Sequence, residues 1–381
     1  MKYILLLLSF SGQIVFADEL MMSLEEAKRQ GFKSPSSSLR NTSPNNGFQN
    51  SRLGTTTNRP ATLKNKQAHQ VSWPFELPYS EGFIGNNMAQ YQPYETPGYH
   101  GGLDMVLESD SWVYAPLDGK VEAGHYSYTS LDDGSHLKHW KPWPASGNET
   151  YFEVAVIDRD GYRYEFHHIN RATLPAEIIA GLDAGNLAVA KGQKIGQVIN
   201  WMTPFHYDHV HANVIDPRGV VLNPEYIYQL LPDHLPPQCK IVAQLSNGSI
   251  KAVDANFKLT NDVINFVVIG SDQKDGNKFS QAPLYYELIF NNGVKSILDF
   301  RKGFTTDDGS VIDIRKIYPQ TLQMPDGTRL KQPTGYYPNK VTFLVNIPLP
   351  IGHNNQSFVL KVADISGNNF VLKYGTKHGP Y

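Results

Sequence analysis

Short apolar runs separated by turn residues recur from about residue 71 to the end of the chain. The first series includes LDMVL, GKVEAG, YFEVAVID, KIGQVI and HVHANVI, with Gly, Asp and Pro between the runs. Such runs, rich in β-branched and aromatic residues, are typical of β-strands joined by tight turns. One helical stretch, PAEIIAGLDAG at residues 175–185, interrupts the series. The pattern therefore predicts a mainly β chain.

A proline-rich stretch, PDHLPPQ at residues 232–238, divides this pattern in two. After it come KIVAQL, DVINFVVIG, LYYELIF, KVTFLVNI and FVLKVADI, separated by turn signals such as NNG, DDG and PDG. Regularly spaced strands with such turns are typical of a β-sandwich. We expect one β domain over residues 71–235 and a β-sandwich over residues 239–381.

The first seventy residues lack this pattern. The stretch MKYILLLLSFSGQIVFADEL has one lysine, an apolar run and Ala17 before Asp18, which is the layout of a secretory signal peptide over residues 1–17. Ser and Gln interrupt the run, so it is a poor transmembrane helix and we expect no stable membrane insertion; an uncleaved anchor is the alternative. Residues 18–70 are too polar to fold alone and are expected to be a linker or a pro-segment.

Composition narrows the class of protein. Hydrophobic residues make up 40% and aromatic residues 12% of the 381 residues, which is ample for a packed core. The formal net charge of -2 gives no electrostatic reason to expect a nucleic acid partner. Cys239 is the single cysteine, so an internal disulfide is excluded, and an exported chain must depend on its core, helped by metal where one binds.

The stretch HVHANV offers a first pair of metal-ligand candidates. In a strand, side chains repeat every two residues, so His209 and His211 share a face with their Cα atoms about 6.5 to 7 Å apart. One ring can then contact an ion and the other a molecule beside it. Two nearby histidines among thirteen are more often surface residues, and a catalytic zinc site needs a third ligand and an open position. The helical HExxH motif of many zinc proteases is absent from the sequence.

A second pair of candidates lies in YHGGLDMVL at residues 99–107. A straight strand would place His100 and Asp104 about 13 Å apart, too far for shared ligation. Gly101 and Gly102 lie between them, where a bend costs least. A bent HGGLD could bring two ligands together; the alternative is a polar turn that opens a strand.

The third candidate stretch is GYRYEFHHIN at residues 161–170. Strand alternation places His168 on one face and His167 on the other, so at most one of the two can face a site. Alternation alone does not say which of the two does so.

In order and spacing, HGGLD, APLDGKV, GYRYEFHHI, VAKGQKIGQV and HVH resemble the motifs of lysostaphin-type zinc endopeptidases. The resemblance covers about residues 72–230, and Phe166 and Ile169 depart from the tyrosine and leucine that are usual in that family. It implies a small antiparallel β-sheet or barrel-like peptidase domain with zinc on the floor of a groove, and hydrolysis of peptidoglycan peptides.

Carried over residue by residue, the resemblance implies that His100, Asp104 and His211 bind Zn²⁺. His168 and His209 would then lie beside the metal-bound water, and measured against the family pattern the spacing from Gly161 favours His168 over His167. We expect His209 to accept the proton and His168 to hydrogen-bond the developing oxyanion or the leaving amine, although the two roles could be exchanged.

We assign no chemical role to His206, which lies in the loop before His209.

Tyr94 and Tyr99, just before His100, could donate to an oxyanion or could be aromatic residues of the groove wall or core. The insertion at residues 125–150 could line the groove with Trp140 and Trp143, or could be a loop whose aromatic side chains are buried. ADISGNN at residues 363–369 resembles the last strand of an immunoglobulin-like module, which could bind cell wall or cover the peptidase domain.

The expectation is an exported, periplasmic or secreted, monomeric zinc metalloendopeptidase that cuts peptide stems or cross-links of bacterial peptidoglycan. The alternatives are a non-catalytic member of the fold that binds wall or activates a hydrolase, and an exported protease for glycine-rich proteins. APLDGKVEAG and VAKGQKIGQV also resemble the turns of biotin and lipoyl carrier domains, but a carrier has no need of HxxxD or HxH.

Overall fold

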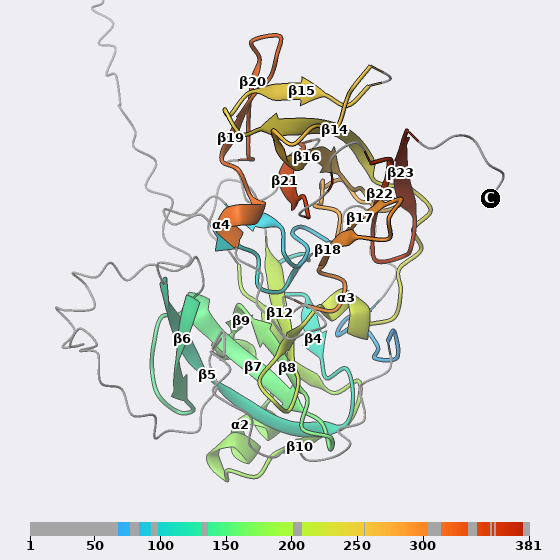
Figure 1. The fold of residues 1–381 in the computed structure, drawn as a ribbon. Coiled ribbons are helices and arrows are strands. Elements are labelled where there is room, and N and C mark those ends of the chain that lie inside the picture. Colours follow the sequence, from blue (N-terminus) through green and yellow to red (C-terminus); the bar gives the residue numbers. More distant parts are fainter. Residues whose placement is uncertain are drawn as a thin grey trace, which may run out of the picture.

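The computed structural model describes residues 68–76, 84–92, 98–130, 136–200, 208–254, 256–303, 314–333, 341–350, 353 and 356–375. The expected signal peptide, most of the polar segment, Tyr94 and His206 lie outside the described residues. Strands and turns dominate, so the mainly β fold class is confirmed (Figure 1). The α-helices are short: α2 (Ala176–Asp183), α3 (Pro224–Ile227) and α4 (Ile314–Ile317). Among the described residues, no helix has the length and hydropathy needed to cross a membrane.

The first β unit is built on an eight-stranded antiparallel sheet with the strand order β10-β5-β7-β8-β12-β13, in which β6 also pairs with β5 and β3 with β12. Its strands are β3 (Leu103–Val106), β5 (Gly119–Ser130), β6 (His136–Pro142), β7 (Phe152–Ile157), β8 (Arg163–His167), β10 (Ala188–Val189), β12 (His209–Ile215) and β13 (Val221–Leu222). A three-stranded sheet packs with it and consists of β4 (Trp112–Tyr114), β11 (Lys194–Val198) and β9 (Ile169–Asn170).

Strand β12 has one apolar and one polar face. Val210, Ala212 and Val214 are fully buried in the hydrophobic core of this unit. The alternate residues His209 and His211 therefore point to the opposite face, because strand side chains alternate. The strand is held between β3 and β8, so His211 faces Asp104 on one side and His167 on the other.

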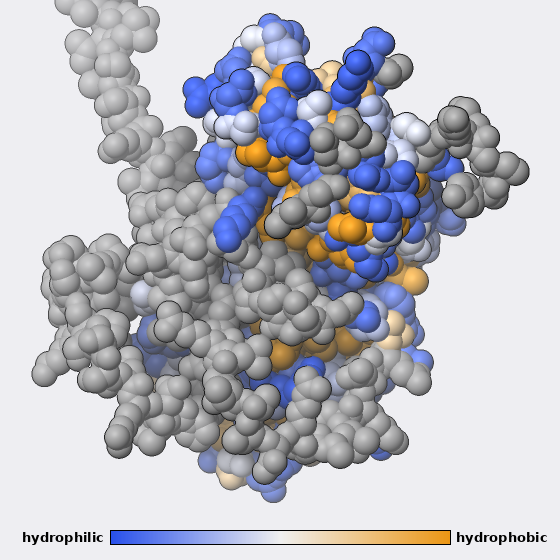
Figure 2. All heavy atoms as spheres, viewed as in Figure 1, coloured by the Kyte–Doolittle hydropathy of each residue, from blue (hydrophilic) through white to orange (hydrophobic). Residues whose placement is uncertain are grey.

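The second β unit has two four-stranded antiparallel sheets that enclose a common core. One sheet contains β14 (Gln238–Leu245), β15 (Ile250–Ala252), β16 (Val263–Ser271) and β21 (Phe343–Pro348); the other contains β17 (Tyr285–Phe290), β18 (Lys295–Asp299), β22 (Phe358–Ala363) and β23 (Asn369–Tyr374). A hairpin of β19 (Thr321–Gln323) and β20 (Arg329–Lys331) covers the other face of the first sheet. Hydrophilic residues cover much of its visible surface (Figure 2).

A stretch of the N-terminal half packs into this second unit. Met88, Ala89 and Tyr91 belong to the core of the sandwich, and Tyr91 lies in the two-residue strand β1 (Tyr91–Gln92), which pairs with β2 (Gly98–Tyr99). Tyr99 also packs against the sandwich core, as the core interpretation expected. The domain boundary at residues 235–239 stays a prediction.

The expected insertion is an extension of the sheet. Strand β6 pairs with the outer half of β5 as a hairpin. Trp143 packs against the core of the first unit, with the Arg171 guanidinium 4.6 Å from its ring. Trp140 is half-buried between Lys138 and Arg163, each 5.4 Å from its ring. The two tryptophans therefore pack against the part of the sheet where β6 is added, and the Lys138 side chain is buried.

Candidate metal centre

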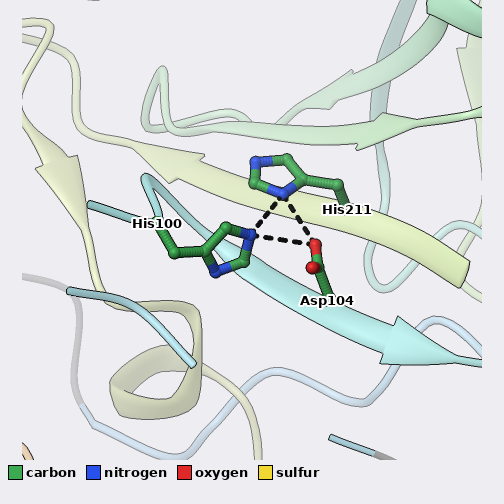
Figure 3. A group of neighbouring side chains, drawn as sticks. All are labelled: His100, Asp104 and His211. Atoms are coloured by element: carbon green, nitrogen blue, oxygen red, sulfur yellow. Dashed lines mark hydrogen bonds and ion pairs between the residues drawn. The ribbon is translucent and has the colours of Figure 1, made fainter. Parts of the chain in front are cut away.

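Three side chains converge on the polar face of β12 (Figure 3). His100 precedes β3, Asp104 lies in β3 and His211 lies in β12. The His100 Nε2, Asp104 Oδ1 and His211 Nδ1 atoms are separated from one another by 2.9 Å in each of the three pairs. The bend expected in HGGLD therefore brings His100 and Asp104 together.

The spacing of these atoms suits a zinc ion. A triangle with sides of 2.9 Å has its corners about 1.7 Å from its centre, and Zn–N and Zn–O bonds are about 2.0 to 2.2 Å long. One ion can therefore reach all three atoms at normal bond lengths. Two imidazoles and one carboxylate are also a donor set that catalytic zinc sites use, with further positions left for water or substrate.

Hydrogen bonds on the far side of two of the candidate ligands, His100 and Asp104, fix the atom that faces the site. His100 Nδ1 lies 3.1 Å from the Asn87 carbonyl oxygen, which can only accept, so Nδ1 carries the hydrogen and Nε2 presents a lone pair. Asn86 Nδ2 donates to Asp104 Oδ2 at 2.8 Å, which leaves Oδ1 for the site. Such partners behind the ligands orient metal sites and fix the histidine tautomer.

The protonation states also suit metal binding. Burial alone would raise the pKa of Asp104, but His100 and His209 hold it well below its usual value. Burial lowers the pKa of His211 to about 4. The carboxyl group is therefore ionised and the His211 ring neutral at pH 7, which are the forms that bind a metal ion.

Gly102 allows β3 and β12 to approach closely at the site. A Cβ atom on this residue would lie 2.4 Å from the Ala212 carbonyl oxygen and 2.8 Å from His211 Nε2. Any larger residue would therefore push His211 or its strand away.

His209 and His168 lie beside the three convergent side chains. His209 Nε2 is 3.8 Å from Asp104 Oδ1, and the His168 and His209 rings are 4.9 Å apart. His168 Nδ1 lies 2.8 Å from the carbonyl oxygen of Thr150 and must donate to it, so its Nε2 atom carries the lone pair. Burial and the neighbouring His209 lower the pKa of His168 well below its usual value. His168 is therefore a neutral imidazole whose Nε2 lone pair can accept a proton.

The rings of both His167 and His168 lie near His211, and which of the two serves the site stays a prediction. The centroid of the His211 ring is 5.0 Å from that of His167 and 6.5 Å from that of His168. The reason is the backbone of His168, which has a φ of 63° and so breaks the strand alternation. This left-handed conformation is uncommon for residues other than glycine, and such residues cluster at functional sites.

His167 belongs to a buried ionic network behind the site. Its Nε2 atom lies 3.2 Å from Glu153 and 3.3 Å from Glu165, and both carboxylates also contact Lys138 and Arg163. Burial lowers the pKa of His167 to about 4, so its ring is neutral and the two cations Lys138 and Arg163 carry the positive charge of this network. Glu153, Glu165 and His167 are close enough to hold a metal ion, but the two cations already neutralise them.

A third group of possible ligands, Asp233, Asp272 and Asp364, lies in and beside the sandwich. Lys274 accompanies it and forms an ion pair with Glu225 at 3.0 Å. This group is far along the chain from the motifs that predicted the site, and it contains no histidine.

Sequence reasoning missed the residues that support the site. Asn86, Asn87 and Gln90 are each 1% exposed, and Gln90 Nε2 donates to Asn86 Oδ1 at 2.6 Å. The available signal was the run GNNMAQ at residues 85–90, where three amides interrupt an otherwise apolar context. Tyr126 was also missed; its ring lies 4.5 Å from that of His167 and its hydroxyl 3.4 Å from His168 Nδ1.

No family model and no curated protein sequence matches this chain. Among solved structures, it is similar to an NMR solution structure of lysostaphin, at 13% sequence identity and a TM-score of 0.24, over 80% of this chain and 92% of that chain. So low a score leaves both the fold and the function to be judged from the geometry of this chain itself.

Proposed function

We propose that the chain is an exported zinc-dependent endopeptidase that hydrolyses peptide stems or cross-links of bacterial peptidoglycan. One observation supports the metallopeptidase part of the proposal: one polar atom each of His100, Asp104 and His211 lie 2.9 Å from one another, and the imidazole side chains of His168 and His209 lie beside them. The substrate class and the export rest on the motif resemblance and on the signal-like first residues.

His100, Asp104 and His211 would hold the ion. When bound in such a site, Zn²⁺ makes water acidic enough to ionise near neutral pH and polarises the carbonyl group of the substrate. Asp104 supplies the one negative charge among the ligands, and its second oxygen stays fixed by Asn86. His211 is held in place between β3 and β8.

His209 is the residue proposed to accept the proton of the attacking water, because its Nε2 atom approaches the ligand Asp104 Oδ1 within 3.8 Å. His168 would hydrogen-bond the developing oxyanion or the leaving amine. Since His168 Nδ1–H is committed to Thr150, only its Nε2 atom can serve the reaction. In the neutral form that atom can only accept, so it can donate to the oxyanion or the leaving amine only after it takes the proton that the attacking water loses, directly or by way of His209, whose ring lies 4.9 Å away.

The test compares wild type, His211→Ala and a control, His234→Ala, in which an exposed histidine distant in sequence from the site is removed. Bound zinc is measured by elemental analysis, and the products of purified peptidoglycan digestion by mass spectrometry. We expect His211→Ala to lose zinc and cleavage and His234→Ala to keep both. Full zinc content and full cleavage by His211→Ala would refute the proposed site, and zinc binding without cleavage by the wild type would refute the enzymatic assignment.

A further inference from the structure

Residues 84–92 are here called the connecting segment. They form hydrogen bonds with two candidate ligands, His100 and Asp104. Asn86 donates through its side chain to Asp104 Oδ2 and accepts through its carbonyl oxygen from Asp104 N at 2.9 Å. The Asn87 carbonyl oxygen accepts from His100 Nδ1. The backbone of His100 also bonds to Gln90, with 2.8 Å between His100 N and Gln90 O. The connecting segment therefore sets the orientation of both side chains.

The same segment is anchored in the C-terminal sandwich. Its Met88 side chain is fully buried in the sandwich core. Side chains and carbonyl groups of the sandwich bond to it as well: Asn277 Nδ2 and Gln281 Nε2 donate to Ile84 O at 2.9 and 3.0 Å, Asn87 Nδ2 donates to Ala282 O at 2.8 Å, and the Tyr318 hydroxyl donates to Ala89 O. The segment lies between the two β units (Figure 1).

The backbone of the segment depends on these anchors. Ala89 has a φ of 68°, which alanine rarely adopts, and it is 2% exposed. Such a conformation is strained and persists only where surrounding contacts impose it. Here both backbone polar groups of Ala89 are bonded. The Tyr318 hydroxyl donates to Ala89 O, and Ala89 N donates to His100 O at 2.9 Å.

We propose that the C-terminal sandwich positions the metal ligands through the connecting segment, and that Asn87 is the positioning residue that joins the two. The Asn87 side chain is fixed by a carbonyl group of the sandwich, and its own carbonyl group holds the His100 ring. The sandwich is thus a structural part of the metal centre in addition to any contact with cell wall. The inference rests on the proposed function only in taking His100, Asp104 and His211 as zinc ligands.

The test measures the zinc affinity of the full chain by competition with a chromophoric chelator, together with the absorption spectrum of the Co²⁺-substituted protein. Removing a hydrogen-bond partner behind a ligand typically costs about 10- to 100-fold in metal affinity. Asn87→Ala keeps the carbonyl group that meets His100 and removes only its anchor to Ala282, so its effect should lie at the lower end of that range. We expect Asn87→Ala to weaken zinc binding about tenfold and to shift the Co²⁺ bands. Tyr318→Phe keeps the ring, touches no ligand and should weaken binding severalfold, so it tests the inference even if Asn87→Ala fails to fold.

Asn223→Ala is the matched control. Asn223 is fully buried, and its Nδ2 atom donates across the units to Phe300 O at 3.1 Å. Its backbone N–H donates to Lys302 O at 2.9 Å, so its described bonds across the units reach residues other than the connecting segment. This variant should lower the melting temperature and keep zinc affinity within about twofold of the wild type. Wild-type affinity in both Asn87→Ala and Tyr318→Phe would overturn the inference, as would an equal loss in Asn223→Ala. A wild type that binds no zinc, or His211→Ala binding as tightly as the wild type, would instead overturn the proposed function.

Discussion

Lys138 Nζ lies 2.9 Å from Glu165 Oε1 in the interior of the first β unit, where the two side chains are only 3% and 1% exposed. Lys138 comes from β6 in the hairpin extension, and Glu165 comes from β8, two residues before His167. Burial alone would raise the pKa of Glu165, but Lys138, His167 and Arg163 together hold it well below its usual value. Lys138, the largest of these favourable contributions, therefore helps to keep a carboxylate ionised behind the candidate metal centre.

Replacing Lys138 by Met should destabilise the protein strongly. The change leaves Glu153 and Glu165 with Arg163 as the remaining cation, and an uncompensated buried charge costs about 3 to 5 kcal/mol. Urea unfolding followed by circular dichroism gives the free energy of unfolding. Lys141→Met removes an exposed lysine of the same strand and should change that free energy by less than about 0.5 kcal/mol. Equal effects of the two substitutions would show that the ionic network does not carry the predicted energy.

His168→Gln and His209→Gln should separate catalysis from metal binding. Neither residue is among the three proposed ligands, so both variants should keep wild-type zinc content while peptidoglycan cleavage falls about 100- to 10,000-fold, as is typical when a general acid or base is removed. His139→Gln, at a half-buried histidine of β6 that bonds to Thr129, is the control and should keep cleavage near the wild-type rate. Loss of zinc from either of the first two variants would make that histidine a ligand rather than a proton carrier.

Gly102→Ala should weaken the metal centre by steric displacement. The new methyl group would lie 2.3 Å from Asn213 Oδ1 and 2.4 Å from Ala212 O, so β12 and His211 must move. We expect a loss of about 1 to 3 kcal/mol in stability and at least about a tenfold loss of zinc affinity.

Gly119→Ala provides the comparison for this change. Its methyl group would lie 2.5 Å from the Ile157 carbonyl oxygen, in a part of the sheet without candidate ligands. It should destabilise the fold similarly and keep zinc affinity. If Gly102→Ala bound zinc as tightly as Gly119→Ala, the close approach of β3 and β12 would not be needed for the site.

Local sequence patterns predicted the strands and the pair of histidines on one face of β12. Alternation of apolar and polar residues is set by the two-residue repeat of a strand, so it can be read from HVHANV alone. The bend in HGGLD was also predictable, because the paired glycines mark where the chain can turn at little cost. These features involve residues that are close in sequence.

The support of the site was not predictable in this way. The contact between Asn87 and Ala282 joins residues 195 positions apart, and nothing local in GNNMAQ indicates which carbonyl group it will meet. The φ of 63° at His168 is imposed by its surroundings, since histidine has no intrinsic preference strong enough to reveal it. In the sequence, Lys138 is one of several charged residues in an insertion. Its ion pair with Glu165 forms only because β6 pairs with β5 and so brings Lys138 to the sheet that contains β8.

The sandwich contains a buried acidic group that makes a distinct prediction. Carboxylate oxygens of Asp233, Asp272 and Asp364 lie within 4.8 Å of one another, and Asp272 is 2% exposed with its Oδ1 atom without a hydrogen-bond partner. Burial, with the charges of Asp364, Asp233 and Glu225, raises the pKa of Asp272 to about 7 although Lys274 lowers it. Asp272 is therefore protonated in the folded protein at pH values where it is ionised in the unfolded chain.

This difference fixes the sign of a pH dependence. Between the ordinary aspartate pKa of 3.8 and about 7, the folded state binds one proton more than the unfolded state, so the free energy of unfolding falls as pH rises, by at most about 1.4 kcal/mol per pH unit for this group. Asp272→Asn removes the titrating group. Its stability relative to the wild type should therefore increase from pH 5 to pH 8, measured by urea unfolding at each pH. Asp160→Asn removes the same charge from an exposed position and should show no such trend. A constant difference between Asp272→Asn and the wild type over this range would mean that Asp272 is ionised throughout in the folded protein, with Lys274 as its effective counter-ion.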